Sequence, residues 1–131
     1  MLTMQRLARE REELSVVDDQ LGSPTWARLL AEATAQIAGR YLVGLDDPAE
    51  ASGIYHMTCA GSTSWYGFAK AILDAGDASC RLSPIPGSDY PTPARRPAYS
   101  VLDNAKLQAR FGIRLPQWED ALKQCLEGAV C

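Results

Sequence analysis

The chain has 131 residues, of which 47% are hydrophobic and 22% charged, proportions typical of a globular domain and not of a disordered chain. This length fits one domain, and no composition shift, repeat or low-complexity tract interrupts it, so residues 1–131 are predicted to form a single domain. The net charge of −3 argues against a nucleic-acid partner, and no stretch approaches the ~18 apolar residues of a membrane span or the apolar core of a signal peptide, so we expect a cytoplasmic protein without membrane contact.

The first third of the chain predicts a helix, a strand and a second helix. Residues 2–12 form the first helix, which begins without an N-cap residue, as expected of a truncated chain. Residues 14–17 form a short strand that ends at Asp18 and the turn formers of 22–24. Ser23 or Thr25 then caps a helix whose apolar residues are spaced by three and four and face the core: Trp26, Leu29, Leu30, Ala33, Ile37 and Tyr41.

The middle of the chain predicts a loop, a strand and a third helix. Residues 46–52 contain Pro48 and form the loop, and residues 53–58 alternate enough to form the strand. Thr63 or Ser64 caps the helix, which Gly76 closes. Its inward residues are Trp65, Phe68, Ala69, Ile72 and Leu73.

The last third predicts a strand and two helices. Residues 81–85 form the strand, Asp103 caps a helix that Gly112 ends, and Pro116 opens the final helix. The final helix carries the apolar stripe Trp118, Ala121, Leu122, Cys125 and Leu126. Four or five helices with about three short strands, and no repeating βαβ unit, predict an α+β fold.

Residues 90–103 contain three prolines around an arginine pair, in the order Tyr-Pro-Thr-Pro-Ala-Arg-Arg-Pro. Proline fixes φ and removes a backbone donor, so this segment is predicted to be a stiff, extended loop. Arg95 and Arg96 at its centre present planar donor groups suited to phosphate or carboxylate oxygens. The alternative is a solvated arginine pair on the surface.

The cysteines and the single histidine do not predict a metal site. Cys59, Cys80, Cys125 and Cys131 lack Cys-x-x-Cys spacing, and a zinc site with His56 would need ligands from scattered positions. We therefore expect reduced thiols and a histidine that is a satisfied core or edge residue.

The segment 90–103, called the proline loop below, resembles a segment near the C-terminus of the dTDP-4-dehydrorhamnose reductases, a family of extended short-chain dehydrogenases/reductases. Further segments resemble that family in its own order, at residues 2–13, 16–25, 53–56, 61–66 and 115–118. The resemblance implies the C-terminal, substrate-binding part of an enzyme that reduces dTDP-4-dehydro-6-deoxy-L-mannose to dTDP-L-rhamnose.

The family's catalytic motifs have no counterpart in this chain. Its glycine-rich dinucleotide motif does not occur, and Tyr66 with Lys70, the one pair with Tyr-x-x-x-Lys spacing, lies in the part that resembles the substrate domain. The resemblance therefore implies that NADPH or NADH binds outside this chain, in an absent N-terminal Rossmann half. The isolated chain is expected to be non-catalytic.

The resemblance also assigns substrate-binding residues. Arg96 holds the position of an arginine that contacts the nucleotide pyrophosphate, with Arg95 as reserve. Tyr90 stacks on the thymine or closes over the sugar, or else packs as a loop aromatic. Gln20 bonds the sugar or base through its amide, or else residues 18–20 form a turn in which Asp side chains bond their own turn and Gly22 takes a positive φ.

Two further implications concern partners. Some family members bind magnesium between subunits through carboxylates, but Arg28 stands at one such position, which puts a metal-bridged homodimer of the full-length protein in doubt, and Glu127 alone is a weak ligand candidate. The alternative function is that of a non-catalytic interaction subunit with the same fold, resembling the regulatory subunit of methionine adenosyltransferase.

Overall fold

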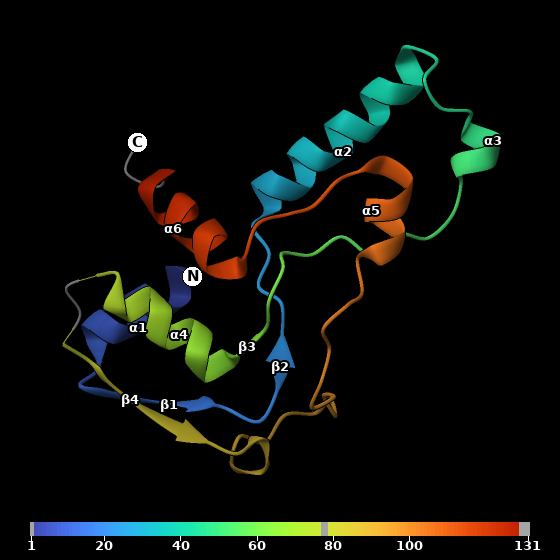
Figure 1. Ribbon diagram of the computed structural model, residues 1–131. Helices are drawn as coiled ribbons and strands as arrows, with labels where there is room; N and C mark the ends of the chain where they lie inside the picture. The colour runs from blue at the N-terminus through green and yellow to red at the C-terminus, as the bar shows by residue number, and fades with distance from the viewer. Residues whose placement is uncertain (1, 77–78, 129–131) are drawn as a thin grey trace. The chain divides into compact units, whose positions relative to one another are not determined.

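The computed structural model describes residues 2–76 and 79–128, which form α-helices and short strands as an α+β chain should (Figure 1). These residues divide into two compact units. We call Met1–Pro24 with Ser62–Val101 the strand unit, and Thr25–Gly61 with Leu102–Cys131 the helical unit.

The strand unit contains all the strands of the described chain. Strand β1 pairs in parallel with β4, and β2 pairs antiparallel with β3. In β4, Pro84 is tolerated because this strand lies at the edge of a two-stranded sheet. The strands predicted at 14–17 and 81–85 are confirmed. In chain order the elements are α1 (Leu2–Glu10), β1 (Glu13–Val17), β2 (Leu21–Gly22), β3 (Thr63–Ser64), α4 (Trp65–Asp74), β4 (Arg81–Ile85) and the 3-10 helix η1 (Gly87–Asp89).

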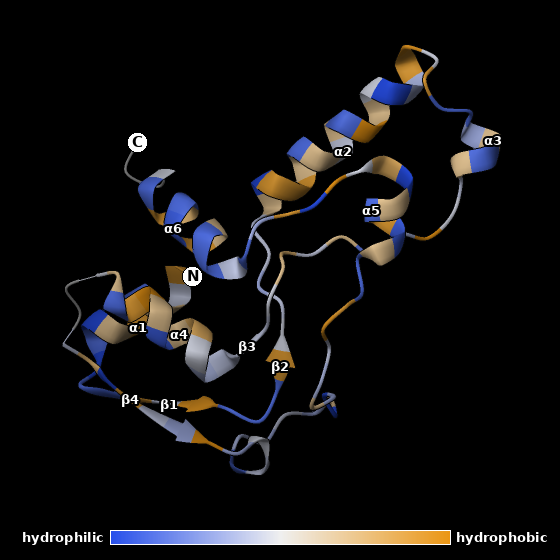
Figure 2. Ribbon diagram, in the orientation of Figure 1, coloured by the Kyte–Doolittle hydropathy of each residue, from blue (hydrophilic) through white to orange (hydrophobic). Residues whose placement is uncertain are grey.

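The core of the strand unit forms where α4 contacts α1 and β1. Figure 2 shows hydrophobic colour on β1 and more polar colours along β4. Spacing correctly predicted the inward face of α4 from Ala69 onward. The buried side chains are Ala8, Leu14, Val17, Ser64, Ala69, Ile72 and Leu73.

The predicted burial of Trp65 is wrong, because its side chain is 57% exposed. Trp65 is the first residue of α4, and helical side chains tilt toward the N-terminus, so its ring projects past the helix end. Of the two predicted caps, Ser64 takes the role: its Oγ accepts a hydrogen bond from the Gly67 amide at 2.9 Å.

The helical unit packs around α5. Buried Ala51, Leu107 and Phe111 form a cluster, on which Ile37 and Tyr41 of α2 pack, together with Tyr55, Met57 and Ile113. In α6, Trp118, Ala121 and Leu122 are buried as predicted, while Cys125 and Leu126 are half-buried. The elements are α2 (Ala27–Leu42), α3 (Pro48–Ala51), α5 (Ala105–Phe111) and α6 (Trp118–Gly128).

Residues 46–52, predicted as a loop, contain the short helix α3. Asp47 caps it by accepting a hydrogen bond from the Ala49 amide at 2.8 Å, and Pro48 occupies its first turn. An Asp followed by Pro is a helix-start signal, because proline suits the first helical position. Pro48 therefore marks the start of a helix, and the predicted loop is wrong at residues 48–51.

The predicted strand at 53–58 is wrong, because side chains satisfy its backbone in place of a neighbouring strand. The side chain of Asn104 donates through Nδ2 to the Thr58 backbone carbonyl at 2.8 Å and accepts through Oδ1 from the Thr58 backbone amide at 3.2 Å. Lys106 Nζ donates to the Ile54 carbonyl at 3.0 Å. The segment is extended without a ladder, and His56 on it is exposed, not in the core.

Several predicted helix boundaries also shift. Asp103 accepts from the Ala105 amide at 2.8 Å, but Asn104 holds the N-cap position of α5. Gly112 ends α5 with φ of 69°, as predicted. Pro116 precedes α6 by two residues, and its carbonyl accepts from the Ala60 amide. The first helix ends at Glu10, two residues before its predicted end.

Thr25 is not the predicted cap of α2. Trp26 holds the N-cap position without a side-chain cap bond, and Thr25 Oγ1 instead accepts from the Cys59 amide at 3.1 Å. Cys59 and Cys80 carry free thiols, and burial raises the pKa of the Cys59 thiol. Cys131 lies outside the described residues.

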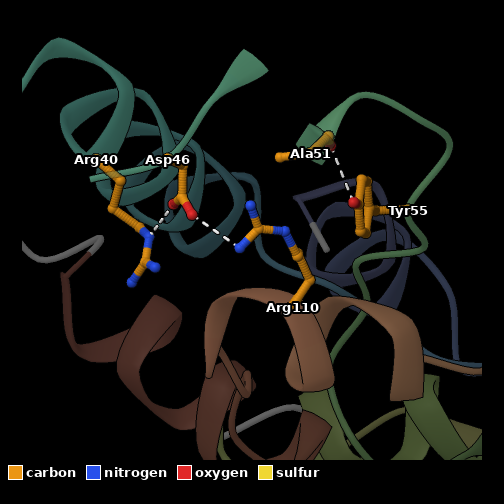
Figure 3. A network of polar contacts seen from close by, with 5 residues as sticks. All are labelled: Arg40, Asp46, Ala51, Tyr55 and Arg110. Atoms are coloured by element: carbon orange, nitrogen blue, oxygen red, sulfur yellow. Dashed lines mark hydrogen bonds and ion pairs between the residues drawn. The ribbon is translucent and has the colours of Figure 1, made fainter. Parts of the chain in front are cut away.

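A buried carboxylate joins two helices of the helical unit (Figure 3). Asp46 binds Arg40 of α2 through Oδ2 and Arg110 of α5 through Oδ1, the latter at 2.7 Å. Hydrogen bonding to these arginines, above all to Arg40, lowers the pKa of Asp46 below its ordinary value. The Tyr55 hydroxyl donates to the Ala51 carbonyl nearby, at 2.9 Å.

Candidate functional site

The candidate site is the proline loop of the strand unit, whose C-terminal end is anchored to β2. The Leu21 amide donates to the Ala98 carbonyl at 2.8 Å, and both the amide and the hydroxyl of Ser100 donate to the Leu21 carbonyl at 2.9 Å. A Cβ on Gly22 would stand 3.2 Å from Ser100 Oγ. Gly22 therefore suits this close approach, and the prediction that it takes a positive φ is wrong.

The 3-10 helix η1, which leads into the loop, is anchored to the segment after β1. Both carboxylate oxygens of Asp19 accept from the Gly87 amide at 2.9 Å, at the start of η1. Asp18 accepts from the Ser64 hydroxyl at the N-cap of α4. The two carboxylates thus bind other segments, and the prediction that they bond their own turn is wrong.

Gln20 lies beside the start of the loop. It is half-buried, and its Nε2 is 2.9 Å from the position that a Cβ on Gly87 would occupy. The side-chain amide of Gln20 therefore lies against Gly87 of η1, which is three residues before Tyr90. A ligand role for Gln20 stays a prediction.

Arg96 is held in place by a neutral group. Its Nη1 donates to Thr92 Oγ1 at 2.7 Å, and the same hydroxyl donates to the Ala94 carbonyl at 2.9 Å. Arg96 is exposed, and it forms no ion pair with any residue that the structure describes. The guanidinium is thus oriented while its charge stays available.

Five other arginines of the described chain contrast with Arg96, because each is paired with a carboxylate. Arg28, for example, lies 2.8 Å from Glu32 Oε1, and Arg81 lies 3.3 Å from Glu13 Oε2. A paired carboxylate neutralises the guanidinium and occupies its donors. The arginines with such a partner are Arg6, Arg28, Arg40, Arg81 and Arg110.

The other members of the loop are also exposed. Arg95 has neither a hydrogen bond nor an ion pair among residues 2–76 and 79–128. Tyr90 is 58% exposed where η1 ends. Tyr99, which sequence reasoning did not select, is 63% exposed and forms a bridge with Leu21. Its position two residues after Pro97 was the available signal.

The exposed groups of this surface have the chemistry that an anion requires. Two adjacent guanidiniums on a loop braced by Pro93 and Pro97 can donate several charge-assisted hydrogen bonds to phosphate oxygens. Exposed Tyr90 and Tyr99 offer ring faces on which a base can stack. Together these groups suit a nucleoside diphosphate.

The Tyr66 and Lys70 spacing has a structural explanation. Lys70 Nζ lies 2.6 Å from Asp74 Oδ2, one turn further along α4, and this carboxylate raises the pKa of Lys70. A lysine engaged in this way has its charge paired with Asp74 and not directed at Tyr66. Lys70 is therefore part of an ion pair on the surface of α4, and its spacing from Tyr66 indicates no catalytic pair.

The residues present do not fit a nicotinamide dinucleotide. A dinucleotide-binding fold has a glycine-rich turn and a helix N-terminus at the carboxyl end of its first strand. In this chain the carboxyl end of β1 leads into Asp18 and Asp19, whose negative charges would repel a pyrophosphate at that position. In the described part of the chain, no three His, Cys, Asp or Glu side chains gather as a metal site, and no helix is long and apolar enough to cross a membrane.

Comparison with known proteins identifies relatives over the whole chain. The model of the RmlD substrate binding domain family matches residues 1–131. A dTDP-4-dehydrorhamnose reductase of Burkholderia thailandensis is 51% identical over 132 residues, covering 95% of this chain and 44% of that protein.

Solved structures agree with this match. The crystal structure of a dTDP-4-dehydrorhamnose reductase ortholog from Clostridium acetobutylicum aligns with a TM-score of 0.86 at 32% identity, covering 99% of this chain and 43% of that one. The reductase from Bacillus anthracis, in complex with NADP, aligns with a TM-score of 0.81 at 32% identity, covering 97% and 42%. The chain spans less than half the length of these relatives.

Proposed function

Because the chain belongs to the RmlD substrate binding domain family, we propose that it is the nucleotide-sugar-binding part of a dTDP-4-dehydrorhamnose reductase. The complete enzyme reduces dTDP-4-dehydro-6-deoxy-L-mannose to dTDP-L-rhamnose, a step toward cell-surface polysaccharide. The chain is a single substrate domain that works in the cytoplasm with an N-terminal Rossmann half, and the full-length protein can form a homodimer. The relatives are named as reductases, which favours this function over a regulatory subunit.

The observation that carries the proposal is the state of Arg96. Among arginines of the described chain whose side chains have a hydrogen-bonded partner, Arg96 is oriented by a hydroxyl, where the others are oriented by carboxylates. A diphosphate needs a guanidinium that is both fixed and still charged. Thr92 supports the first condition without removing the second.

The chain's contribution to the reaction is recognition and orientation. Arg96, with Arg95 beside it, neutralises the diphosphate, Tyr90 stacks on the base or covers the sugar, and the Gln20 amide bonds the sugar or base. The nicotinamide cofactor, bound by the other half, supplies the hydride. Fixing the diphosphate sets the position of the sugar's C4 carbonyl, which converts an encounter into a productive arrangement.

Calorimetric titration of the 131-residue chain with dTDP and with thymidine tests the proposal. We expect dTDP to bind weakly and thymidine more weakly still, because the phosphate contacts dominate. Raising the salt concentration from about 0.1 M to about 1 M shortens the Debye length from about 10 Å to about 3 Å and should weaken dTDP binding. Equal affinities for dTDP and thymidine, or an affinity independent of salt, would contradict a phosphate-led site.

A second measurement concerns catalysis. The chain alone, mixed with the nucleotide-sugar substrate and either nicotinamide cofactor, should show no oxidation of the cofactor, because the dinucleotide motif and the catalytic pair lie outside it. Turnover above background in a purified sample would overturn the division of labour between two halves.

A further inference from the structure

We propose that Thr92 is a positioning residue for nucleoside diphosphate binding, acting through Arg96 and making no contact with the ligand itself. This inference rests on the proposed function of the proline loop and adds to it a residue whose side chain carries no charge. It concerns how the loop keeps an exposed arginine ready for an anion.

The geometry of the Thr92 hydroxyl fixes its role. A hydroxyl has one proton to donate and lone pairs to accept with. The Thr92 proton goes to the Ala94 carbonyl at 2.9 Å, so a lone pair of the same oxygen faces Arg96 Nη1 at 2.7 Å. Since arginine is always protonated and only donates, this arrangement suits it without any rotation of the hydroxyl.

The backbone around the hydroxyl is stiff. Pro91 and Pro93 flank Thr92, and Pro97 follows Arg96, so φ is fixed at three positions of a seven-residue segment. The hydrogen bonds from Thr92 to Ala94 and from Arg96 to Thr92 close this segment on itself. The side-chain entropy that Arg96 would lose on binding a ligand is therefore partly lost beforehand.

The choice of a hydroxyl matters because it leaves charge and donors available. Arginine has five N–H donors, and the bond to Thr92 engages one nitrogen. A carboxylate in place of the hydroxyl would fix the side chain equally well but would compete with the incoming phosphate, as Glu32 would at Arg28. A positioning residue next to an anion-binding arginine is thus expected to be neutral.

A double-mutant cycle on the 131-residue chain tests the inference, with dTDP as the probe and affinity and melting temperature as the readouts. Arg96→Ala should weaken binding about 10- to 100-fold. Thr92→Val removes the hydroxyl at nearly constant volume and should weaken binding about 3- to 10-fold. In the Arg96→Ala background Thr92→Val should change the affinity less than about twofold, because the hydroxyl then has no guanidinium to orient.

Two further variants separate positioning from a general effect on the loop. Thr92→Ser retains the hydroxyl and should bind within about twofold of the original chain. Thr34→Val is the matched control, because the Thr34 hydroxyl is also exposed and also donates to a backbone carbonyl, that of Leu30 at 2.7 Å. In the described part of the chain, no arginine side chain is hydrogen-bonded to this hydroxyl. It should leave the affinity unchanged.

The outcomes distinguish the two proposals. An unchanged affinity of Thr92→Val, an equal loss in both backgrounds, a loss in Thr92→Ser as large as in Thr92→Val, or a lowered melting temperature with unchanged affinity would each overturn the positioning role. If Arg96→Ala binds as tightly as the original chain, or if dTDP does not bind at all, the proposed function of the loop fails, and the role of Thr92 fails with it.

Discussion

Two arginine sites in this chain hold the same side chain with different partners. In the helical unit, Arg40 and Arg110 converge on buried Asp46, and each guanidinium is paired with one oxygen of that carboxylate (Figure 3). In the strand unit, Arg96 is exposed and bonded to the Thr92 hydroxyl, and its charge is uncompensated among the described residues. The partner thus decides between a structural arginine and one available to a ligand.

The two sites should also lose different properties when they are changed. Removing the carboxylate at Asp46 leaves two converging cations, so the cost falls on folding. Removing Arg96 exposes nothing buried, so the cost should fall on binding. Substitutions at the two sites should therefore separate effects on stability from effects on binding.

The largest effect on folding is expected from Asp46→Asn. The amide cannot pair with both arginines, and Arg40 and Arg110 would repel one another beside the α2 and α5 helices that they now join. We expect the melting temperature, measured by circular dichroism, to fall by roughly 5 °C or more. Affinity for dTDP, measured well below that temperature, should stay within about twofold. A variant that melts with the original chain would show that the network is dispensable.

The next effect concerns binding. Arg96→Ala should weaken dTDP binding about 10- to 100-fold with little change in melting temperature, because the lost interactions are charge-assisted hydrogen bonds to the ligand. Arg96→Lys should restore only part of this, since an ammonium cannot reproduce the planar fork. Arg28→Ala is the control, because that exposed guanidinium is paired with Glu32. A lower melting temperature with unchanged affinity would identify Arg96 as a structural residue.

A smaller effect should appear in acid. The pKa of Asp46 is lowered in the folded chain, so the unfolded chain binds more protons as the pH falls below the ordinary Asp value of about 3.9. The stability that Asp46 contributes is present above that pH and is lost as the pH falls through the folded pKa. When the melting temperature is plotted against pH between about pH 5 and about pH 2, the slope should therefore be smaller for Asp46→Asn than for the original chain. Parallel slopes would contradict a charged Asp46 in the fold.

The smallest effect is expected at Glu13. The Ser83 hydroxyl, followed by Arg81, lowers the pKa of Glu13, but Glu13 and Arg81 are exposed and Ser83 is only half-buried on the β1–β4 sheet. Exposed pairs are screened and contribute little. Glu13→Gln should shift the melting temperature by less than about 2 °C. A loss as large as that of Asp46→Asn would show that burial does not separate these ion pairs.

The regular elements of the chain were predictable from periodicity and capping. The strands of β1 and β4, the inward face of α4 and the end of α5 at Gly112 all follow from local pattern. The segment 53–58 was not predictable, because its backbone partners are side chains such as Asn104, 46 residues away from Thr58. Periodicity reports which face is apolar and not which group pairs with the backbone.

The candidate site was also only partly predictable from the sequence. Proline spacing predicted the stiff loop, and its arginine pair suggested the ligand class. The hydroxyl that orients Arg96 depends on how the loop closes on itself, and the anchors at Leu21 and Gly87 depend on contacts between distant segments. The sequence predicted that both Trp65 and Trp118 face the core, but Trp65 is exposed and Trp118 is buried.

The measurement that tests the central claim most directly is a titration of the isotope-labelled 131-residue chain with dTDP, followed through its backbone amide NMR signals. If the proline loop is the binding surface, the signals of the non-proline residues in 90–100 should move first and furthest. Those of Leu21 and Gly87 should follow, because their hydrogen bonds anchor the loop. If signals elsewhere shift on titration while those of residues 90–100 do not move, the proline loop is not the binding surface.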